Sequence, residues 1–335
     1  MTPTTASVVW LDAAGTLALR EEALAAPGDG QLLCATIVSA ISPGTELAAY
    51  KGLPPLRPGN PYPRLQGYCN VAQVIESRAA GFEVGDRVLT FSSHRSHFVT
   101  SVDAVLLKLS PNADAGQAAC SYLYHLGYNA VLRADVRAGH KVVVQGLGLL
   151  GLTSTAMAAI AGADVYAVSS HGAAAVRALS MAASGVFPRS EEAALVERLG
   201  PGGADVVITT VGGWDDWHAA LRLAGPRGTI AVLGFPGRGE PVPSFNPLDS
   251  QYFYMKQLRI EAVGMSPELP DSRGFLRFNE RANLAWIAGL IDTGLLDASL
   301  IISGRYPAAR IEDAYRDLIA RRDDPVTYLL DWNAA

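Results

Sequence analysis

The chain contains few cysteines, and this scarcity excludes several classes of protein. Only three occur in 335 residues, namely Cys34, Cys69 and Cys120. An odd number of widely separated cysteines matches neither a disulfide framework nor the close pairs of a zinc knuckle. We therefore expect three reduced thiols in a cytoplasmic protein.

Concentrated charge and unbroken apolar runs are missing as well. The formal net charge is −5 without a basic cluster, which argues against nucleic acid as a partner. The first residues lack the basic and apolar blocks of a signal peptide. Glycines interrupt the apolar stretch 142–168, so it fits a strand–helix–strand unit better than a membrane span. We expect a soluble protein of about two domains that binds neither nucleic acid nor membrane.

A glycine-patterned turn directly after an apolar run is the most informative feature that is present. The apolar run spans 142–145, and a helix-compatible, alanine-rich segment spans 152–161. Between them lie three glycines in the pattern G-x-G-x-x-G: Gly146, Gly148 and Gly151. The first permits a tight turn, the second lets the main chain approach a pyrophosphate, and the third lets helix and strand pack closely.

This turn predicts a dinucleotide site. The pyrophosphate would lie on the turn, including Leu149 and Leu150, where the helix N-terminus offers free N–H groups. The pattern alone is weak in a glycine-rich chain, but a second apolar strand at 165–168 gives it the expected context. A structural glycine-rich turn is the alternative.

The end of that second strand bears on which dinucleotide binds. An NAD site usually has a carboxylate there for the ribose 2′-hydroxyl, and none follows Val168. The residues present are Ser169, Ser170 and His171, with Arg177 opening the next helical stretch. Hydroxyls and a guanidinium donate to a phosphate, which a carboxylate would repel, so the set predicts NADPH/NADP⁺. If the serines only cap the helix and Arg177 is a solvated surface charge, the choice stays open.

The first third of the chain has a β-rich pattern. Short apolar runs alternate with glycine, proline and aspartate, which predicts strands at 7–11, 31–40, 71–75, 87–90, 97–100 and 105–109. The proline-rich segment 52–67 predicts an extended loop, and a loop of this length is more often a pocket wall or lid than filler.

From residue 118 the pattern becomes helical and then alternates. Helices are expected at 118–134, 173–183, 214–223, 281–293 and 311–321. Strands are expected at 141–145, 165–168, 206–210, 229–233, 258–264, 300–306 and 326–330. Continuous apolar strands separated by helices indicate a parallel sheet covered on both faces.

Five motifs in this order resemble the medium-chain dehydrogenase/reductase superfamily over nearly the whole chain. They are 85–88, the turn 146–151, 205–213, 228–234, and 301–307 with 311–315. The resemblance implies an α/β protein with two domains. A GroES-like β-barrel would span 1–120 and 266–335, and a Rossmann domain with a doubly wound parallel sheet would span 121–265.

The resemblance also implies where cofactor and substrate lie. Thr210 would belong to the cofactor site, and three residues would border the nicotinamide: Val211, Gly234 and Phe235. Substrate and nicotinamide would meet between the domains. The strand 258–264 would form a sheet edge where family members pair, so a homodimer is expected.

The zinc ligands of the family are replaced in this chain. Residues 42–46 match the first ligand motif with Pro43 at the cysteine position, and Gly67-Tyr68-Cys69 matches Gly-His-Glu with Tyr68 at the histidine. Tyr122 falls near the third position. Proline cannot ligate, and phenols are poor zinc ligands beside imidazole and thiolate. The cysteine lobe of the structural zinc is missing too, so we expect no metal.

Without zinc, a protein group or the substrate itself must carry the developing charge. By resemblance Thr45 relays a proton, and Tyr68 and Tyr122 converge on the vacated metal position. A phenol with an ordinary pKa near ~10 can donate at neutral pH. The alternative is that both phenols only fill the volume of the metal. Other candidate acids are Tyr50, Tyr62, His94, Tyr124 and His125; we expect His125 to be packed and His94 to lie at a pocket rim.

Zinc-free relatives among the quinone oxidoreductases and enoyl reductases mostly reduce activated C=C bonds. The resemblance therefore favours hydride transfer from NADPH to such a bond in a small apolar metabolite. A carbonyl or imine reductase, or an alcohol dehydrogenase of a specialised metabolite, is the second hypothesis. Residues 42–46 and 329–332 support it, because they are similar to the branch of bacteriochlorophyllide dehydrogenases. A non-catalytic NADPH sensor is the third.

Overall fold

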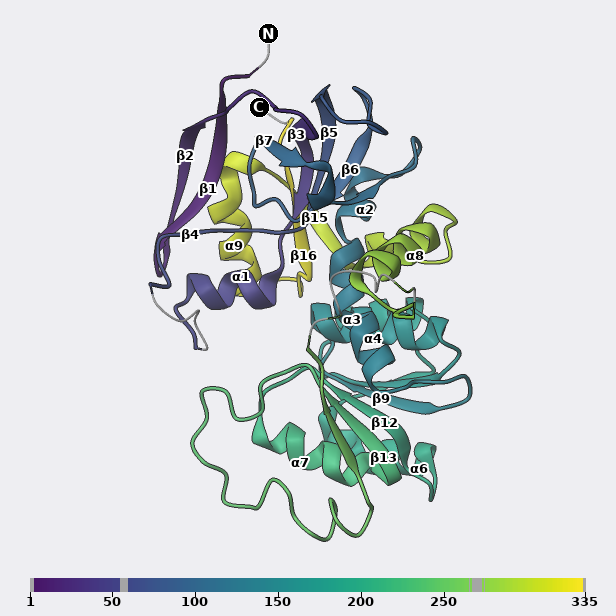
Figure 1. Ribbon diagram of the computed structural model, residues 1–335. Helices are drawn as coiled ribbons and strands as arrows, with labels where there is room; N and C mark the ends of the chain where they lie inside the picture. The colour runs from purple at the N-terminus through teal and green to yellow at the C-terminus, as the bar shows by residue number, and fades with distance from the viewer. Residues whose placement is uncertain (1–2, 55–59, 265, 267–272, 274, 334–335) are drawn as a thin grey trace. The chain divides into compact units, whose positions relative to one another are not determined.

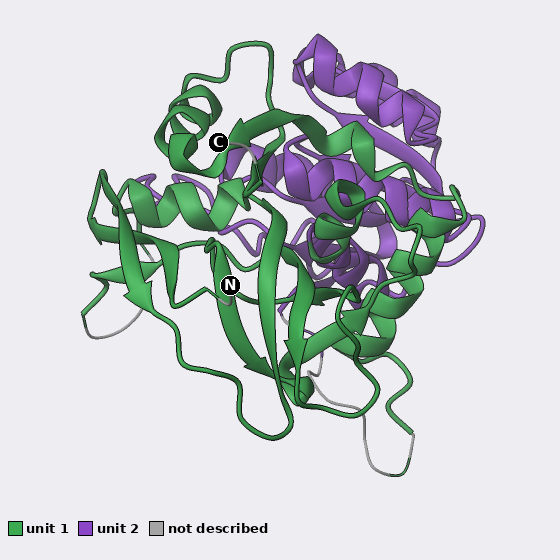
Figure 2. Ribbon diagram, turned by 90° about the horizontal axis from the view of Figure 1, so that it is seen from above, with its two compact units in different colours: residues 1–122, 269–335 green, residues 123–268 purple. Residues whose placement is uncertain are grey.

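The computed structural model describes residues 3–54, 60–264, 266, 273 and 275–333 (Figure 1). The chain divides into two compact units (Figure 2). Unit 1 comprises residues 1–122 and 269–335, and unit 2 comprises residues 123–268. In the described part of the chain, no helix is long and apolar enough to cross a membrane.

Unit 1 contains a mixed seven-stranded sheet and a three-stranded sheet. The larger sheet has the order β15-β16-β3-β5-β6-β8, with β7 also paired to β3. Its strands are β3 (Gln31–Ala40), β5 (Asn70–Ser77), β6 (Arg87–Thr90), β7 (His97–Ser101), β8 (Val105–Lys108), β15 (Ile302–Pro307) and β16 (Thr327–Asp331). The smaller sheet joins β1 (Thr5–Ala13), β2 (Thr16–Ala23) and β4 (Arg64–Leu65).

Four helices belong mainly to unit 1. They are α1 (Pro43–Tyr50), α2 (Ala115–Ala119), α8 (Glu280–Asp292) and α9 (Ile311–Ala320). The apolar side of α9 packs with strand residues in one core cluster that includes Val9, Ile41 and Tyr315. A second core cluster is formed by side chains of β3, β5 and β6, such as Leu32, Val74 and Val88. These cores fix the strand ends and α1, which carry the candidate site of this unit.

Unit 2 is built on six parallel strands in the order β11-β10-β9-β12-β13-β14. They are β9 (Lys141–Gln145), β10 (Asp164–Val168), β11 (Gly185–Phe187), β12 (Ala204–Thr209), β13 (Ala224–Val232) and β14 (Arg259–Ala262). The chain runs outward from β9 to β11 and returns to β12 on the other side of β9. The strand order therefore reverses between β9 and β12, where doubly wound sheets bind ligands.

Helices cover both faces of this sheet. They are α3 (Ser121–Arg133), α4 (Leu149–Ile160), α5 (Gly172–Ser180), α6 (Glu192–Leu199) and α7 (Trp214–Leu223). Figure 1 shows α3 and α4 on one face and α6 and α7 on the other. The central strand residues Val142, Val143 and Val144 are fully buried, as expected for a sheet covered on both sides. This is the α/β architecture that the sequence predicts.

Most expected elements are present, but the sequence patterns miss β2, β4, β11, α1 and α6. Strand β2 has no buried residue and so no apolar alternation. Strand β11 is only three residues long, and α1 begins with proline and glycine. The expected helix 118–134 is interrupted at Cys120, which separates α2 from α3. Within the expected loop 52–67, β4 pairs with β1, and residues 55–59 lie outside the described part.

Candidate active site

The three glycines of the turn after β9 meet three different steric demands. Gly146 has a φ of +85°, and a Cβ there would lie 2.5 Å from Val211. A Cβ on Gly151 would lie 1.7 Å from the carbonyl oxygen of Gly146. Gly148 has no heavy atom within 4 Å of that position, so its open side leaves room for a ligand. These are the roles that the sequence pattern predicts.

Helix α4 begins at this turn without a side-chain cap. Gly148 is the N-cap residue, and no side chain accepts from the first-turn N–H groups. Those groups, which include the N–H of Leu149 and Leu150, keep their donors and the positive end of the helix dipole for an anion. The glycine cradle and the uncapped helix together fit a pyrophosphate.

Thr210 and Val211, which are expected at the cofactor, lie against the same turn, and Gly234 lies against Val211. Thr210 Oγ1 donates to the carbonyl oxygens of Gln145 (2.9 Å) and Gly146 (3.1 Å), which ties the end of β12 to the turn. A Cβ on Gly234 would lie 2.5 Å from the oxygen of Val211, so the two segments touch. Phe235 is 55% exposed and carries the Arg238 guanidinium over its ring.

The residues expected at the 2′-phosphate are only partly brought together. Ser169 follows β10, and its hydroxyl accepts from the N–H of His171. Ser170 and His171 are exposed. Arg177 does not open the next helix as expected, because α5 already begins at Gly172 and Arg177 lies in its last turn. Arg177 lies five residues after Gly172, which is ~7.5 Å along the helix axis.

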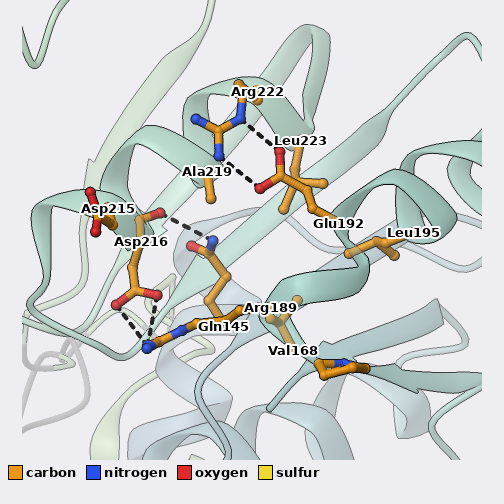
Figure 3. Close-up of a pocket in the computed structure, with 11 residues that line it drawn as sticks. Gln145, Val168, Arg189, Glu192, Leu195, Asp215, Asp216, Ala219, Arg222 and Leu223 are labelled. Atoms are coloured by element: carbon orange, nitrogen blue, oxygen red, sulfur yellow. Dashed lines mark hydrogen bonds and ion pairs between the residues drawn. The ribbon is translucent and has the colours of Figure 1, made fainter. Parts of the chain in front are cut away.

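A cavity of about 250 Å³ lies at the carboxyl ends of β9 and β10, next to α6 and α7 (Figure 3). Two ion pairs line it. The Arg189 guanidinium contacts both carboxylate oxygens of Asp216 at 2.7 and 2.8 Å, and Arg222 contacts both of Glu192 at 2.6 and 2.7 Å. Burial raises the pKa of Asp216 against the opposing effect of Arg189. The sequence patterns give no signal for this cavity, because its residues are far apart in the chain.

In unit 1 the three predicted catalytic residues lie together. The Tyr68 hydroxyl donates to Ser42 Oγ at 2.5 Å and reaches Thr45 Oγ1 at 3.5 Å. The rings of Tyr68 and Tyr122 meet edge to face with centroids 5.6 Å apart. Phe91 packs on the other side of Tyr122, at 4.8 Å between centroids. Burial raises the pKa of Tyr68 far above its ordinary value, so this phenol is neutral and can donate.

A buried carboxylate, that of Glu46, holds the backbone beside this cluster. Glu46 is 1% exposed. Its carboxylate accepts from the N–H of Ser42 (2.6 Å) and the hydroxyl of Tyr315 (2.5 Å), and it contacts His94 Nε2 at 2.9 Å. His94 Nδ1 contacts Ser39 Oγ at 2.8 Å, and Trp332 Nε1 donates to the same oxygen. Because a carboxylate only accepts hydrogen bonds, Nε2 of His94 carries the proton of this contact and donates it to Glu46.

His94 also touches the segment that carries Tyr68. Its N–H donates to the oxygen of Gln66 at 2.7 Å, and its ring lies against Gly67. A Cβ on Gly67, which has a φ of +83°, would come within 2.5 Å of that ring. The sequence suggests His94 for a pocket rim, and this is wrong, because the residue is fully buried. Its partners come from three distant segments, which sequence spacing cannot reveal.

The remaining candidate acids serve the interior of their units. Tyr62 donates to the oxygen of Ala49 at 2.6 Å, and Tyr50 packs edge to face on Tyr315. Tyr124 and His125 are fully buried. Burial lowers the pKa of His125 to about 4, so it is neutral near pH 7, and its expected packed role is confirmed.

Comparisons with known proteins find similar dehydrogenases. A family model described as zinc-binding dehydrogenase matches residues 150–278. A 2-desacetyl-2-hydroxyethyl bacteriochlorophyllide A dehydrogenase of Rhodobacter capsulatus is 26% identical over 325 residues, which is 92% of each chain. A 2-dehydro-3-deoxy-L-galactonate 5-dehydrogenase of Pseudoalteromonas atlantica is 27% identical over 215 residues. That match spans 64% of this chain and 58% of the relative's length.

Solved structures share the fold over nearly the full chain. The 2R,3R-butanediol dehydrogenase of Bacillus subtilis superposes with a TM-score of 0.82 at 18% identity, covering 98% of this chain and 100% of that one. A Sinorhizobium meliloti protein described as a zinc-binding dehydrogenase bound to NADP gives 0.79 at 20% identity, with the same coverage. Residues 150–278 are thus similar to the zinc-binding dehydrogenase family, and the whole chain shares the fold of solved dehydrogenases. The relatives and solved structures named here are described as dehydrogenases, and the comparisons go no further than this similarity.

The zinc-dependent members of the superfamily differ from this chain at the metal position. Pro43 is the first residue of α1 and offers no ligand atom. Tyr68 offers a phenol, and Cys69 offers a thiol whose pKa is raised by burial. Among the described residues, no three His, Cys, Asp or Glu side chains gather as a metal would need. The segment 150–278 that matches the zinc-binding family model contains none of these positions, and the donor set does not fit a catalytic zinc.

Proposed function

We propose that this chain is a member of the medium-chain dehydrogenase/reductase superfamily, namely a zinc-independent, NADP(H)-dependent oxidoreductase that transfers hydride to an activated C=C bond of a small apolar metabolite. The observation that carries the proposal is the cluster of Tyr68, Ser42 and Thr45 at the position where relatives hold a cation. This cluster offers neutral hydroxyl donors in place of a Lewis acid.

The chemistry follows from what these groups can do. The dinucleotide, when bound, supplies a hydride. Tyr68 is a neutral phenol, so by turning its single O–H from Ser42 to a substrate oxygen it can donate a hydrogen bond there and stabilise negative charge that develops. An enone spreads that charge over an enolate and needs less stabilisation than an isolated ketone. Tyr122 and Phe91 add aromatic surface, which suits an apolar substrate.

The choice of NADP(H) rests on the end of β10. Ser169, Ser170 and His171 stand where an NAD site usually has a carboxylate, and they donate to a phosphate without repelling it. The similar Sinorhizobium structure was solved with NADP. We keep NAD(H) as the alternative.

A second function is favoured by one comparison. The Rhodobacter relative, which matches along 92% of its length, is named for the oxidation of a hydroxyethyl group. Alcohol, carbonyl or imine chemistry on a specialised metabolite is therefore our second candidate, and a catalytically silent NADPH sensor is the third.

The test uses the purified chain with NADPH and a panel of enones. We expect NADPH consumption, a saturated ketone as product and no dependence on added or bound zinc. The Tyr68→Phe variant should bind NADPH normally yet turn over at least tenfold more slowly, since loss of one charge-stabilising donor typically costs about 10²–10³ in rate. An allylic alcohol as product would favour the second candidate, and binding without turnover would favour the sensor. Stoichiometric zinc required for turnover would contradict the proposal.

Two properties of the whole chain complete the proposal. We propose a homodimer that pairs through β14, which has a strand partner on one side only among the described residues. We also propose a cytoplasmic location, which the three free and buried thiols suit.

A further inference from the structure

The loop after β11 runs alongside the loop after β10. The two strands pair in parallel, with Val168 opposite Phe187. The N–H of Ser169 donates to the oxygen of Phe187 at 3.0 Å, so the pairing continues one residue past β10. Pro188 and Arg189 therefore leave the sheet beside Ser169 and Ser170, the two hydroxyls expected at the 2′-phosphate.

Arg189 also faces the cavity at this end of the sheet. Its guanidinium lines the cavity together with Val168 and Gln145, and Figure 3 shows it reaching toward Asp216. The Arg189 side chain is 62% exposed, whereas that of Asp216 is 13% exposed. Arg177 does not line the cavity.

The second guanidinium of the cavity, that of Arg222, is less available. Arg222 forms a bidentate pair with Glu192, and its side chain is only 37% exposed. Arg189 uses one terminal nitrogen for both oxygens of Asp216, and a guanidinium has five N–H donors. Of the two, Arg189 is the more exposed and engages fewer of its nitrogens, so it offers more donors to another anion.

We propose that Arg189, and not Arg177, receives the 2′-phosphate of NADP(H), and that Asp216 limits the affinity by holding the same guanidinium. The proposal rests on the proposed use of NADP(H). A planar guanidinium suits a phosphate well because it donates in a fork. The carboxylate of Asp216 would remain beside the phosphate and repel it, so the ion pair tunes the discrimination between the two coenzymes.

The experiment measures dissociation constants for NADP⁺ and NAD⁺ by calorimetry, with 2′-AMP and AMP as probes of the adenosine half alone. We expect Arg189→Ala to weaken NADP⁺ and 2′-AMP at least tenfold, as loss of charge-assisted hydrogen bonds to phosphate typically does. Binding of NAD⁺ and AMP should stay within about twofold, because neither ligand carries the 2′-phosphate. Arg189→Lys should recover part of the loss.

Asp216→Asn should change the affinity for NADP⁺ in the opposite direction. Removing the competing charge while keeping the side-chain shape should tighten NADP⁺ several-fold and leave NAD⁺ unchanged. Arg177→Ala and Arg222→Ala are the matched controls, since each removes one arginine of the same unit. Both should leave the ratio of the two dissociation constants as in the wild type.

Separate outcomes overturn the separate claims. If Arg177→Ala abolishes the preference for NADP⁺ and Arg189→Ala does not, the assignment to Arg189 is wrong while the proposed coenzyme stands. If Asp216→Asn weakens NADP⁺ or leaves it unchanged, the competing role of Asp216 is wrong. If the wild type prefers NAD⁺ and binds 2′-AMP no better than AMP, the proposed use of NADP(H) itself fails. Melting curves like that of the wild type establish that each variant is folded.

Discussion

At the scale of single residues, Glu46 connects the two segments that carry Ser42 and Tyr68. Its carboxylate holds the N–H of Ser42, and its contact with His94 supports the segment before Tyr68. Sequence reasoning identifies Tyr68 and Tyr122 only as replacements for metal ligands. It does not reveal Glu46 and it misplaces His94, because their partners Ser39 and Tyr315 come from segments that meet only after folding.

Removing this carboxylate should destabilise unit 1. We expect Glu46→Ala to lower the free energy of unfolding by about 3 kcal/mol, because three buried groups lose a charged partner. Urea unfolding followed by tryptophan fluorescence measures the change. Glu76→Ala is the control, since the Glu76–Arg78 pair is partly exposed, and such pairs contribute only about 0–1 kcal/mol. Equal losses in both variants would contradict the supporting role of Glu46.

At the scale of elements, different glycines in the turn before α4 serve the packing of the fold and the binding of the cofactor. Gly151 has backbone at 1.7 Å from an added Cβ, whereas Gly148 has open space and a φ of −76°. The sequence pattern predicts this turn and both flanking elements, since the demands of a dinucleotide fold are local. It misplaces Arg177, because the start of α5 depends on the backbone after β10 and not on the position of a charge.

Alanine at each glycine should therefore have a different effect. We expect Gly151→Ala to destabilise unit 2 by about 3 kcal/mol, because helix and strand must move apart. Gly148→Ala should change stability by less than about 0.5 kcal/mol yet weaken NADPH about tenfold, since the methyl group takes space that a pyrophosphate needs. Thermal melts and NADPH titrations measure the two effects. Normal NADPH binding by Gly148→Ala would contradict the placement of the pyrophosphate.

At the scale of the whole molecule, the sequence predicts the fold well and the pocket poorly. Apolar periodicity identifies nearly all strands of the parallel sheet, because these strands are buried on both faces. The exposed β2 and the three-residue β11 carry no such signal. The cavity with Arg189 and Asp216 depends on β11, so the pattern that fails for this strand also fails for the site beside it.

The proposed pairing through β14 predicts the mass of the assembly. Light scattering after size exclusion should give twice 35.3 kDa, because an unpaired edge strand readily adds a second copy. Successive N–H groups of a strand point to opposite sides, so one of the adjacent residues Ile260 and Glu261 directs its N–H to the open edge. Proline at that position should yield a folded single chain. A single-chain mass for the wild type at micromolar concentration would contradict the dimer.

The contact between the His94 ring and Gly67 has a practical consequence for anyone who wishes to re-engineer substrate scope. Position 67 tolerates neither a side chain nor an ordinary backbone angle, so randomising it would fill a mutant library with misfolded clones. Diversity belongs instead at Thr45, Phe91 and Tyr122, whose side chains are not fully buried. The buried residues Glu46 and His94, which support this cluster, are better left unchanged.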